Sequence, residues 1–374
     1  MNSLLSTSQL TLNSQLSTLN SHPLMRPRVT FLSLTACLVL LFATCLFVGS
    51  VHIPAASVWT ILTGGTVEND VWSFIILETR LPAAITAVLC GAALAVSGLL
   101  LQTAFRNPLA GPGIFGITNG AALGVALVML FWGGALTVPA FSLPFSSGWE
   151  SGSGLSAAIY GFSAILTAAF LGAMFVTLLL LLLSRWVRSN VMLLIVGMMV
   201  GYLSSSLIAL LNFAATEEGV RSYMVWGLGS FGGVSMQLMP VYSVVTLLSL
   251  GGACMLVKPL NALLLGERYA SNLGINTRRL RSWLLVVTGL LCAVATAFCG
   301  PIAFLGLAVP HMARLCLGTA NHRQLMPATI LMGAVVALAC HLLSMVLSRG
   351  GAVPINALTP LFGAPVIIYV ILKK

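Results

Sequence analysis

The chain has 374 residues, of which 59% are hydrophobic and only 6% charged, and its mean hydropathy is +1.05. Soluble domains usually carry about 25% charged residues, so this composition excludes a soluble globular protein and indicates an integral membrane protein. The formal net charge of +10 therefore has to be interpreted through the positions of the charges.

The first 29 residues are rich in Ser, Thr, Leu and Asn, and Arg26 and Arg28 stand just before the first apolar run. We expect a disordered cytoplasmic tail over 1–29, followed by an uncleaved first span. A cleaved signal peptide is the alternative, although the basic residues come late and no convincing small-residue cleavage site follows the run. Residues 30–374 are then predicted to be a single transmembrane domain.

Apolar runs long enough to cross a bilayer, which takes about 20 residues each, recur along the rest of the chain. They are too long and too continuously apolar for the alternating strands of an outer-membrane barrel. The sequence therefore predicts an all-α, polytopic membrane protein with about ten transmembrane helices. The predicted spans are 30–50, 81–104, 114–136, 157–184, 191–213, 237–257, 280–299, 302–318, 325–348 and 359–372.

The distribution of charge supports this span count, because Lys and Arg accumulate in cytoplasmic loops. With the N-terminus inside, all 17 basic residues fall in inside segments except Arg80, Arg221 and Arg349, and all 7 acidic residues fall outside except Glu267. A missed span would mix the two signs of charge. We therefore predict that both termini are cytoplasmic and that the net charge reflects topology, with no nucleic acid as a partner.

Several features of coupled or catalytic membrane proteins are absent from the sequence. No Asp or Glu lies in a predicted span, and such residues usually carry the protons or sodium ions of coupled transporters. The GxxxxGK[ST] phosphate loop is missing, so ATP would have to be hydrolysed by another subunit. Three of the five histidines, His311, His322 and His341, are scattered along the second half of the chain, and HEXXH and GxSxG are missing. The eight cysteines lie in or beside apolar runs and form no CxxC pair. We therefore predict no active site, no metal and no cofactor.

The segment QTAFRNPLAGPGIFGITNGA (102–121) places Arg, two Asn, two Pro and four Gly between two apolar runs. Its Pro and Gly residues predict a tight turn back into the membrane instead of a helix. Irregular backbone at membrane depth is tolerated only where it is buried in protein or lines a water-filled path. From composition alone, an ordinary connecting loop is the other interpretation.

The longer segment from Arg80 to Gly124, which contains this turn, resembles the signature of FecCD-type permeases, the membrane subunits of ABC importers for ferric siderophores, haem and cobalamin. Four further blocks match the family in the same order: MVWGLGSF (224–231), LLLGERYASNLGIN (263–276), GPIAFLGLAVPHMARLCLG (300–318) and LFGAPVIIYVILKK (361–374). The resemblance implies an ATP-driven importer in a bacterial inner membrane. Two copies of this subunit would form the pathway, two ATP-binding subunits would dock inside, and a substrate-binding protein would deliver cargo outside.

The resemblance also assigns a role to the turn. In the family, the Asn and Leu of an NPL turn lie at the cytoplasmic constriction of the pathway, which corresponds to Asn107 and Leu109. Such a short collar could close by small shifts of a backbone that Pro and Gly hold in shape. Ser189 and Asn190, in the next inside turn, are also considered for the gate, but a simple turn is the favoured interpretation there.

The block LLLGERYASNLGIN looks helical and has basic residues on both sides. One interpretation is an interfacial helix that lies on lipid headgroups. Similarity to the coupling helix of the family favours a second one, in which this segment docks onto the ATP-binding subunit. The residues assigned to this contact are Gly266, Glu267, Arg268, Ala270, Leu273 and Gly274.

On the outside, the family uses arginines near the mouth of the pathway to pair with acidic residues of the binding protein, and such pairs mainly set register and encounter rate. Arg80 matches the first Arg of the family's RLPR motif, whereas Ala83 replaces the second. We predict that Arg349, helped by Arg221, takes part in docking together with Arg80. Ordinary juxtamembrane arginines are the alternative.

The ninth predicted span departs from the family, with His341, Met345 and Ala352 where Asp, Arg and Glu are usual. For His341 we expect a hydrogen bond to a neighbouring helix in preference to haem ligation, and for Met345 we expect packing. His311 belongs to a Pro-His pair that is common to the family, so it carries no information about haem.

GPGIFG (111–116) is similar to GPIAFLG (300–306), and the predicted topology puts the first at the inner face and the second at the outer face. This similarity suggests an inverted-topology repeat.

The predicted function is that of a non-enzymatic permease subunit, embedded in membrane lipid, that imports an iron chelate, haem or cobalamin. An ion-coupled secondary transporter and a non-transporting structural or receptor subunit are the alternatives.

Overall fold

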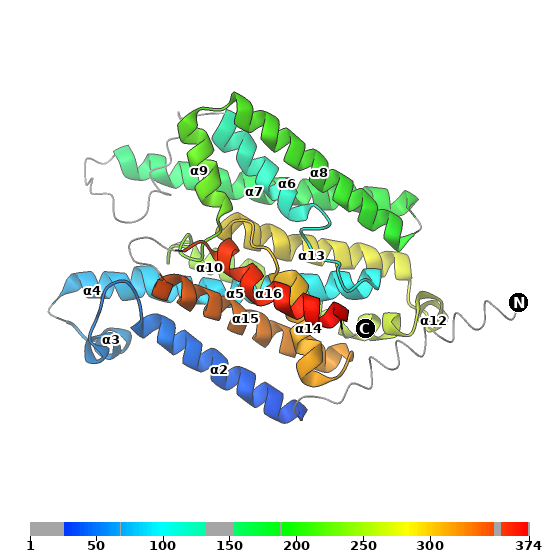
Figure 1. Ribbon diagram of the computed structural model, residues 1–374, viewed down its shortest axis with the longest axis horizontal. Coiled ribbons are helices and arrows are strands. Elements are labelled where there is room, and N and C mark those ends of the chain that lie inside the picture. Colours follow the sequence, from blue (N-terminus) through cyan, green and yellow to red (C-terminus); the bar gives the residue numbers. More distant parts are fainter. Residues whose placement is uncertain (1–25, 68, 132–152, 188, 348–352, 373–374) are drawn as a thin grey trace, which may run out of the picture.

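The computed structural model describes residues 26–67, 69–131, 153–187, 189–347 and 353–372, and no strand occurs among them, which confirms the all-α prediction. The helices lie mostly along one long axis (Figure 1). They are α2 (Pro27–Phe47), α3 (Ala55–Leu62), α4 (Asp70–Phe74), η1 (Ile75–Arg80), α5 (Leu81–Phe105), α6 (Ile117–Ala126), η2 (Leu127–Phe131), α7 (Ser153–Trp186), α8 (Asn190–Ala214), α9 (Glu217–Gly227), α10 (Met239–Met255), α11 (Val257–Leu264), α12 (Glu267–Asn272), α13 (Thr277–Cys299), α14 (Leu305–Leu317), α15 (His322–Leu347) and α16 (Ile355–Leu372).

Within the described residues, six helices are long and apolar enough to cross a membrane, or seven if the bent pair α10 and α11 forms one span. Three shorter apolar helices, Ile117–Leu130, Leu305–Leu317 and Ile355–Val370, occupy the remaining predicted spans. Every predicted span therefore overlaps an apolar helix. The exact number of crossings stays a prediction.

Several boundaries differ from those predicted. The second long helix begins at Asp70, eleven residues before the predicted start at 81, because a π-helical stretch, η1, joins α4 to α5 without a break. The first helix begins at Pro27, where the missing N–H of proline is not needed. Residues 1–25 of the predicted tail and 132–136 of the third predicted span lie outside the described residues.

Helix α5 forms the centre of the bundle and is buried along most of its length. Its small residues allow close approach of neighbouring backbones: Gly91 meets Gly333 of α15, and Gly98 meets Gly306 of α14. Small residues at crossings are typical of membrane helices, where packing must supply the attraction between helices. The glycines thus fix how α14 and α15 cross α5.

The helices around α5 and α13 repeat one arrangement. Helix α5 packs against α14 and α15, and α13 packs against α6 and α7, while α5 and α13 also contact each other. The α5–α13 contact is antiparallel, because Ser97 accepts a hydrogen bond from the Cys292 thiol at 3.7 Å while Cys90 lies beside Cys299. The first helix of each half, α5 or α13, thus packs against the two helices that follow the other one, and the two run in opposite directions. An inverted repeat predicts this arrangement.

The two ends of the bundle differ in charge. Figure 1 places α3, α4 and α9 at one end and α12 at the other. The first end, here called the outer end, carries the acidic residues of α4, η1 and α9, whereas the second, the inner end, carries the basic residues of α12 and early α13. This separation agrees with the sidedness predicted from the loops.

Candidate gate and coupling site

The turn that follows α5 has a defined structure built by its own side chains. We call Asn107, Pro108 and Leu109 the gate turn. The Asn107 Oδ1 accepts a hydrogen bond from the Leu109 N–H at 2.9 Å, and the Asn107 carbonyl accepts one from the Ala110 N–H at 3.1 Å. Asn favours such side-chain-closed turns. The Leu109 side chain is left 42% exposed, so it is free to contact a second surface.

Helix α14 holds the gate turn from one side. The His311 Nε2 donates to the Pro108 carbonyl oxygen at 2.7 Å. Nearby, the Gln102 Nε2 donates to the Leu307 carbonyl at 3.0 Å, and the Arg314 Nη1 donates to the Gln102 Oε1 at 2.8 Å. His311 was not predicted to be a gate residue, because a Pro-His pair within an apolar run does not indicate which segment it will face.

The segment of α11 and α12 holds the other side. Arg106, the residue between α5 and the gate turn, donates from Nη2 to the Leu263 carbonyl oxygen at the end of α11, at 2.8 Å. Helix α12 begins four residues later at Glu267, after Gly266. The predicted gate and the predicted coupling residues, which are far apart in sequence, are therefore neighbours at the inner end.

The predicted coupling residues do not all face outward. Ala270 is fully buried, whereas Leu273 and Gly274 are exposed. The Glu267 carboxylate pairs with Arg281 at 3.3 Å. Arg268 is exposed and, with residues of the same helix and Arg106, lines a surface hollow of about 610 Å³. Leu265 and Tyr269, which were not predicted as coupling residues, also line this hollow with exposed apolar side chains.

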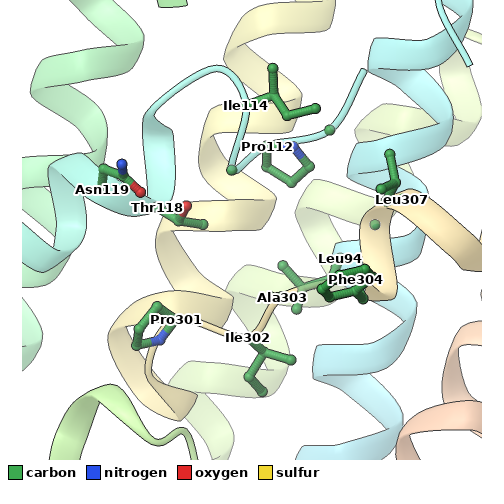
Figure 2. Close-up of a pocket in the computed structure, with 13 residues that line it drawn as sticks. Leu94, Pro112, Ile114, Thr118, Asn119, Pro301, Ile302, Ala303, Phe304 and Leu307 are labelled. Carbon is green, nitrogen blue, oxygen red and sulfur yellow. The ribbon is translucent and has the colours of Figure 1, made fainter. Parts of the chain in front are cut away.

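A second feature lies between the two Gly-Pro motifs. Figure 2 shows loop residues 111–114 facing residues 301–307 across a cavity of about 320 Å³. Its side chains are mainly apolar, and Thr118 and Asn119 contribute polar groups. The Asn119 Nδ2 donates to the Gly201 carbonyl of α8 at 3.1 Å. Phe304 has a positive φ of 66°, which a non-glycine residue rarely adopts. The two similar motifs thus line one cavity, so the prediction that they lie at opposite faces of the membrane is wrong.

The predicted docking residues have different surroundings. Arg80 is only 4% exposed, and its Nη1 donates to the carbonyls of Leu46 at 2.9 Å and Phe47 at 3.2 Å, while Nη2 donates to the Val51 carbonyl. In this arrangement the guanidinium caps the end of α2 and is not available to a partner. Arg221 is exposed on α9 at the outer end. Arg349 lies outside the described residues.

The remaining predicted positions carry little support for a site. His341 is 7% exposed, and its Nε2 has no hydrogen-bond partner among the described residues. This nitrogen therefore does not make the hydrogen bond to a neighbouring helix that we expected of His341; the ring packs edge-on against Phe231, with centroids 5.8 Å apart. Met345 is half-buried, and Ser189 precedes α8 without a side-chain cap. In the described part of the chain, no group of three or more His, Cys, Asp or Glu could hold a metal ion.

A polytopic helical bundle with an irregular turn at its inner end and an exposed helix beside it is the arrangement expected of a membrane transport permease. The chain belongs to the FecCD transport family, which matches residues 37–373. This finding confirms the resemblance of the sequence motifs.

Individual relatives agree with this assignment. The chain is 33% identical to the hemin transport system permease protein HmuU of Yersinia pestis over 337 residues, which cover 90% of this chain and 94% of that protein. It is 35% identical to the vitamin B12 import system permease protein BtuC of Klebsiella pneumoniae over 300 residues, 80% of this chain and 82% of that protein. A solved structure described as an inward-facing metal-chelate type ABC transporter superposes with a TM-score of 0.76 at 31% identity, covering 93% of this chain and all of that one.

These relatives are importer permeases, so the chain is a permease subunit of the ABC importer type. The comparisons support this function and not the ion-coupled or structural alternatives. They do not identify a single cargo, because the names of the relatives differ in what is carried.

Proposed function

We propose that two copies of this chain form the translocation pathway of a bacterial inner-membrane importer for an iron chelate, haem or cobalamin. ATP would be hydrolysed by two partner subunits docked at the inner end, and a binding protein would deliver cargo at the outer end. The single observation that carries the proposal is the position of the gate turn beside an exposed helix, α12, in a chain of this family.

The surface of α12 suits a protein partner. Leu265, Tyr269 and Leu273 are 63%, 52% and 59% exposed, respectively, next to the exposed cation of Arg268. Apolar anchors within a polar rim are typical of protein interfaces. The contact residues proposed for the ATP-binding subunit are Gly266, Glu267, Arg268, Leu273 and Gly274, with Ala270 supporting them from within.

At the outer end, the proposed docking residues are Arg221 and Arg349, which would pair with acidic residues of the binding protein. Arg80 was predicted to share this role, but its burial supports a structural contribution. Charge pairs at an interface mainly affect the association rate and depend on salt. Binding of the partner should therefore weaken with rising ionic strength.

Membrane lipid and the second copy would cover the remaining apolar surface. Large apolar side chains are exposed along α2, α7, α8 and α10, including Leu40, Phe175, Phe213 and Leu248. Their exposure is expected for helices that face lipid tails or a matching helix. No charged cofactor or metal is required for this part of the function.

The test is reconstitution of the subunit with its cognate ATPase and binding protein in lipid vesicles. ATP-dependent uptake of ferric siderophore, haem and cobalamin would be measured in parallel, with vesicles that lack the binding protein as a control. Uptake of one cargo would support the proposal and identify the cargo. Uptake that persists without the ATPase and collapses with an uncoupler would contradict it.

A further inference from the structure

On the basis of the proposed function, we propose that Arg106 is the positioning residue that passes movement of the ATPase-docking helix α12 to the gate turn. An acidic side chain of the ATP-binding subunit would contact the same guanidinium. Three observations support this inference: the backbone of Arg106, the bond of its side chain, and the charge of the hollow that it lines.

The backbone of Arg106 joins α5 to the gate turn without any intervening residue. Arg106 lies in the left-handed region, with φ 48° and ψ 35°, where non-glycine residues are uncommon. The Asn107 N–H donates to the Gln102 carbonyl at 3.2 Å, which closes the end of α5. A shift of Arg106 must therefore change the direction in which the chain enters the gate turn.

The side chain of Arg106 ends on the segment that leads into α12. The carbonyl oxygen of Leu263 accepts the bond from the Arg106 Nη2 at 2.8 Å and another from the Gly266 N–H at 3.1 Å. Gly266 has φ 125°, and a Cβ built on it would lie 3.4 Å from the Arg106 Nη2. One carbonyl oxygen thus joins the gate-side arginine to the glycine from which α12 starts.

The charge of the hollow indicates what the partner brings. The Arg106 guanidinium has five N–H donors, and its one hydrogen bond to a described residue is the bond to Leu263. Arg106 and Arg268 both line the hollow, while the carboxylate of Glu267 is paired with Arg281. The unneutralised charge is positive, so a carboxylate of the ATP-binding subunit is the complementary group.

Coupling efficiency, measured as cargo transported per ATP hydrolysed in the reconstituted importer, tests the inference. Compared at equal amounts of assembled complex, the Arg106→Ala variant should transport about tenfold less cargo per ATP hydrolysed than wild type, the scale of one lost charge-assisted hydrogen bond. Arg106→Lys, which keeps a donor, should recover part of the loss. The matched control is Arg279→Ala, which removes an exposed arginine of the same end whose side chain bonds to no described residue.

A second measurement follows the gate itself. A cysteine placed by Leu109→Cys, in a Cys254→Ser background, reports how fast a membrane-impermeant thiol reagent reaches the gate turn from the inside. ATP should change this labelling rate in the parent and in Arg279→Ala, but not in Arg106→Ala. The labelling rate of the Cys254→Ser protein that keeps Leu109 is subtracted, because it reports labelling of the other cysteines.

The outcomes distinguish a failure of the proposed function from a failure of the proposed role of Arg106. A wild-type complex that transports none of the cargoes with ATP would contradict the proposed function itself. Normal transport by wild type together with an unchanged coupling ratio in Arg106→Ala would overturn only the inference. Loss of assembly in both Arg106 variants would also overturn it, because the residue would then serve docking alone.

Discussion

The two ends of helix α5 are held in different ways. At the outer end, the buried Arg80 donates to three backbone carbonyls at and beyond the end of α2. At the inner end, the exposed Arg106 donates to a single carbonyl at the end of α11. Both arginines cap another helix, where carbonyl oxygens lack partners within the helix, but the first bond set is enclosed and the second is open to a partner.

The difference between the enclosed Arg80 bonds and the open Arg106 bond indicates which end of α5 is less firmly held. The outer end and the middle of α5 are fixed by buried bonds and by glycine contacts, so a change that starts at the inner end is not absorbed by a shift of the whole helix. The gate turn is held by one bond from His311 and by the connection through Arg106. If α12 moves as proposed, we therefore expect the shift to be largest in the few residues of the gate turn next to it.

The largest effect is expected from the middle of α5, in the Gly98→Ala variant. A Cβ on Gly98 would collide with the carbonyl oxygen of Gly306, and backbone cannot move aside as a flexible side chain can. Overpacking of this kind destabilises by about 3 kcal/mol. Thermal unfolding of the purified protein in detergent should show a clearly lower Tm and a smaller folded fraction.

The matched control for that variant is Gly251→Ala. Gly251 also lies within a helix, α10, but nothing comes within 4 Å of a Cβ built there. Because Ala is a better helix former than Gly, the free energy of unfolding of this variant should rise by up to about 1 kcal/mol. Equal Tm values for the two variants would show that the crossing of α5 and α14 is not tight.

The second-largest loss of stability is expected at the outer end, in the Arg80→Ala variant. Loss of the guanidinium leaves the Leu46 and Phe47 carbonyls without these donors, and lost hydrogen bonds of a charged group cost about 2 kcal/mol. The Tm should fall, while Arg221→Ala, which removes an exposed arginine of the same end, should leave it unchanged. An Arg80→Ala protein of normal Tm that no longer binds the binding protein would instead restore the docking role predicted from the sequence.

The burial of Arg80 could not be predicted from the sequence. The RLP motif predicted an arginine that is available to a partner, but Arg80 is buried because the segment 46–51 folds back over it. The helical spans were predictable, because continuous apolar runs leave few alternatives in a bilayer. The extension of the second helix to Asp70 was not, because polar residues in 70–80 interrupt the apolar pattern while the π-helical stretch keeps the helix continuous.

In the candidate site, too, the motifs predicted which residues take part but not how they contact one another. Asn107 and the residues of 266–274 were placed by motif, and the structure brings them to one end of the bundle. Their connection through Arg106 and Leu263 could not be predicted, because it joins positions 157 residues apart that share no pattern. Ala270 was assigned to the partner face, although its small side chain is what allows α12 to lie on the core.

The smallest effect is expected at the inner end, where His311→Ala removes the donor to the Pro108 carbonyl. One neutral hydrogen bond contributes about 1 kcal/mol, so the Tm should change little. Because that bond holds the gate turn against α14, its loss should instead raise the labelling rate of Leu109→Cys in the absence of ATP. His311→Gln, whose amide can still donate, should stay close to wild type. If all three proteins were labelled at the same rate, the gate turn would be held by Arg106 alone, and the contrast between a firmly anchored outer end and a lightly held inner end would become sharper.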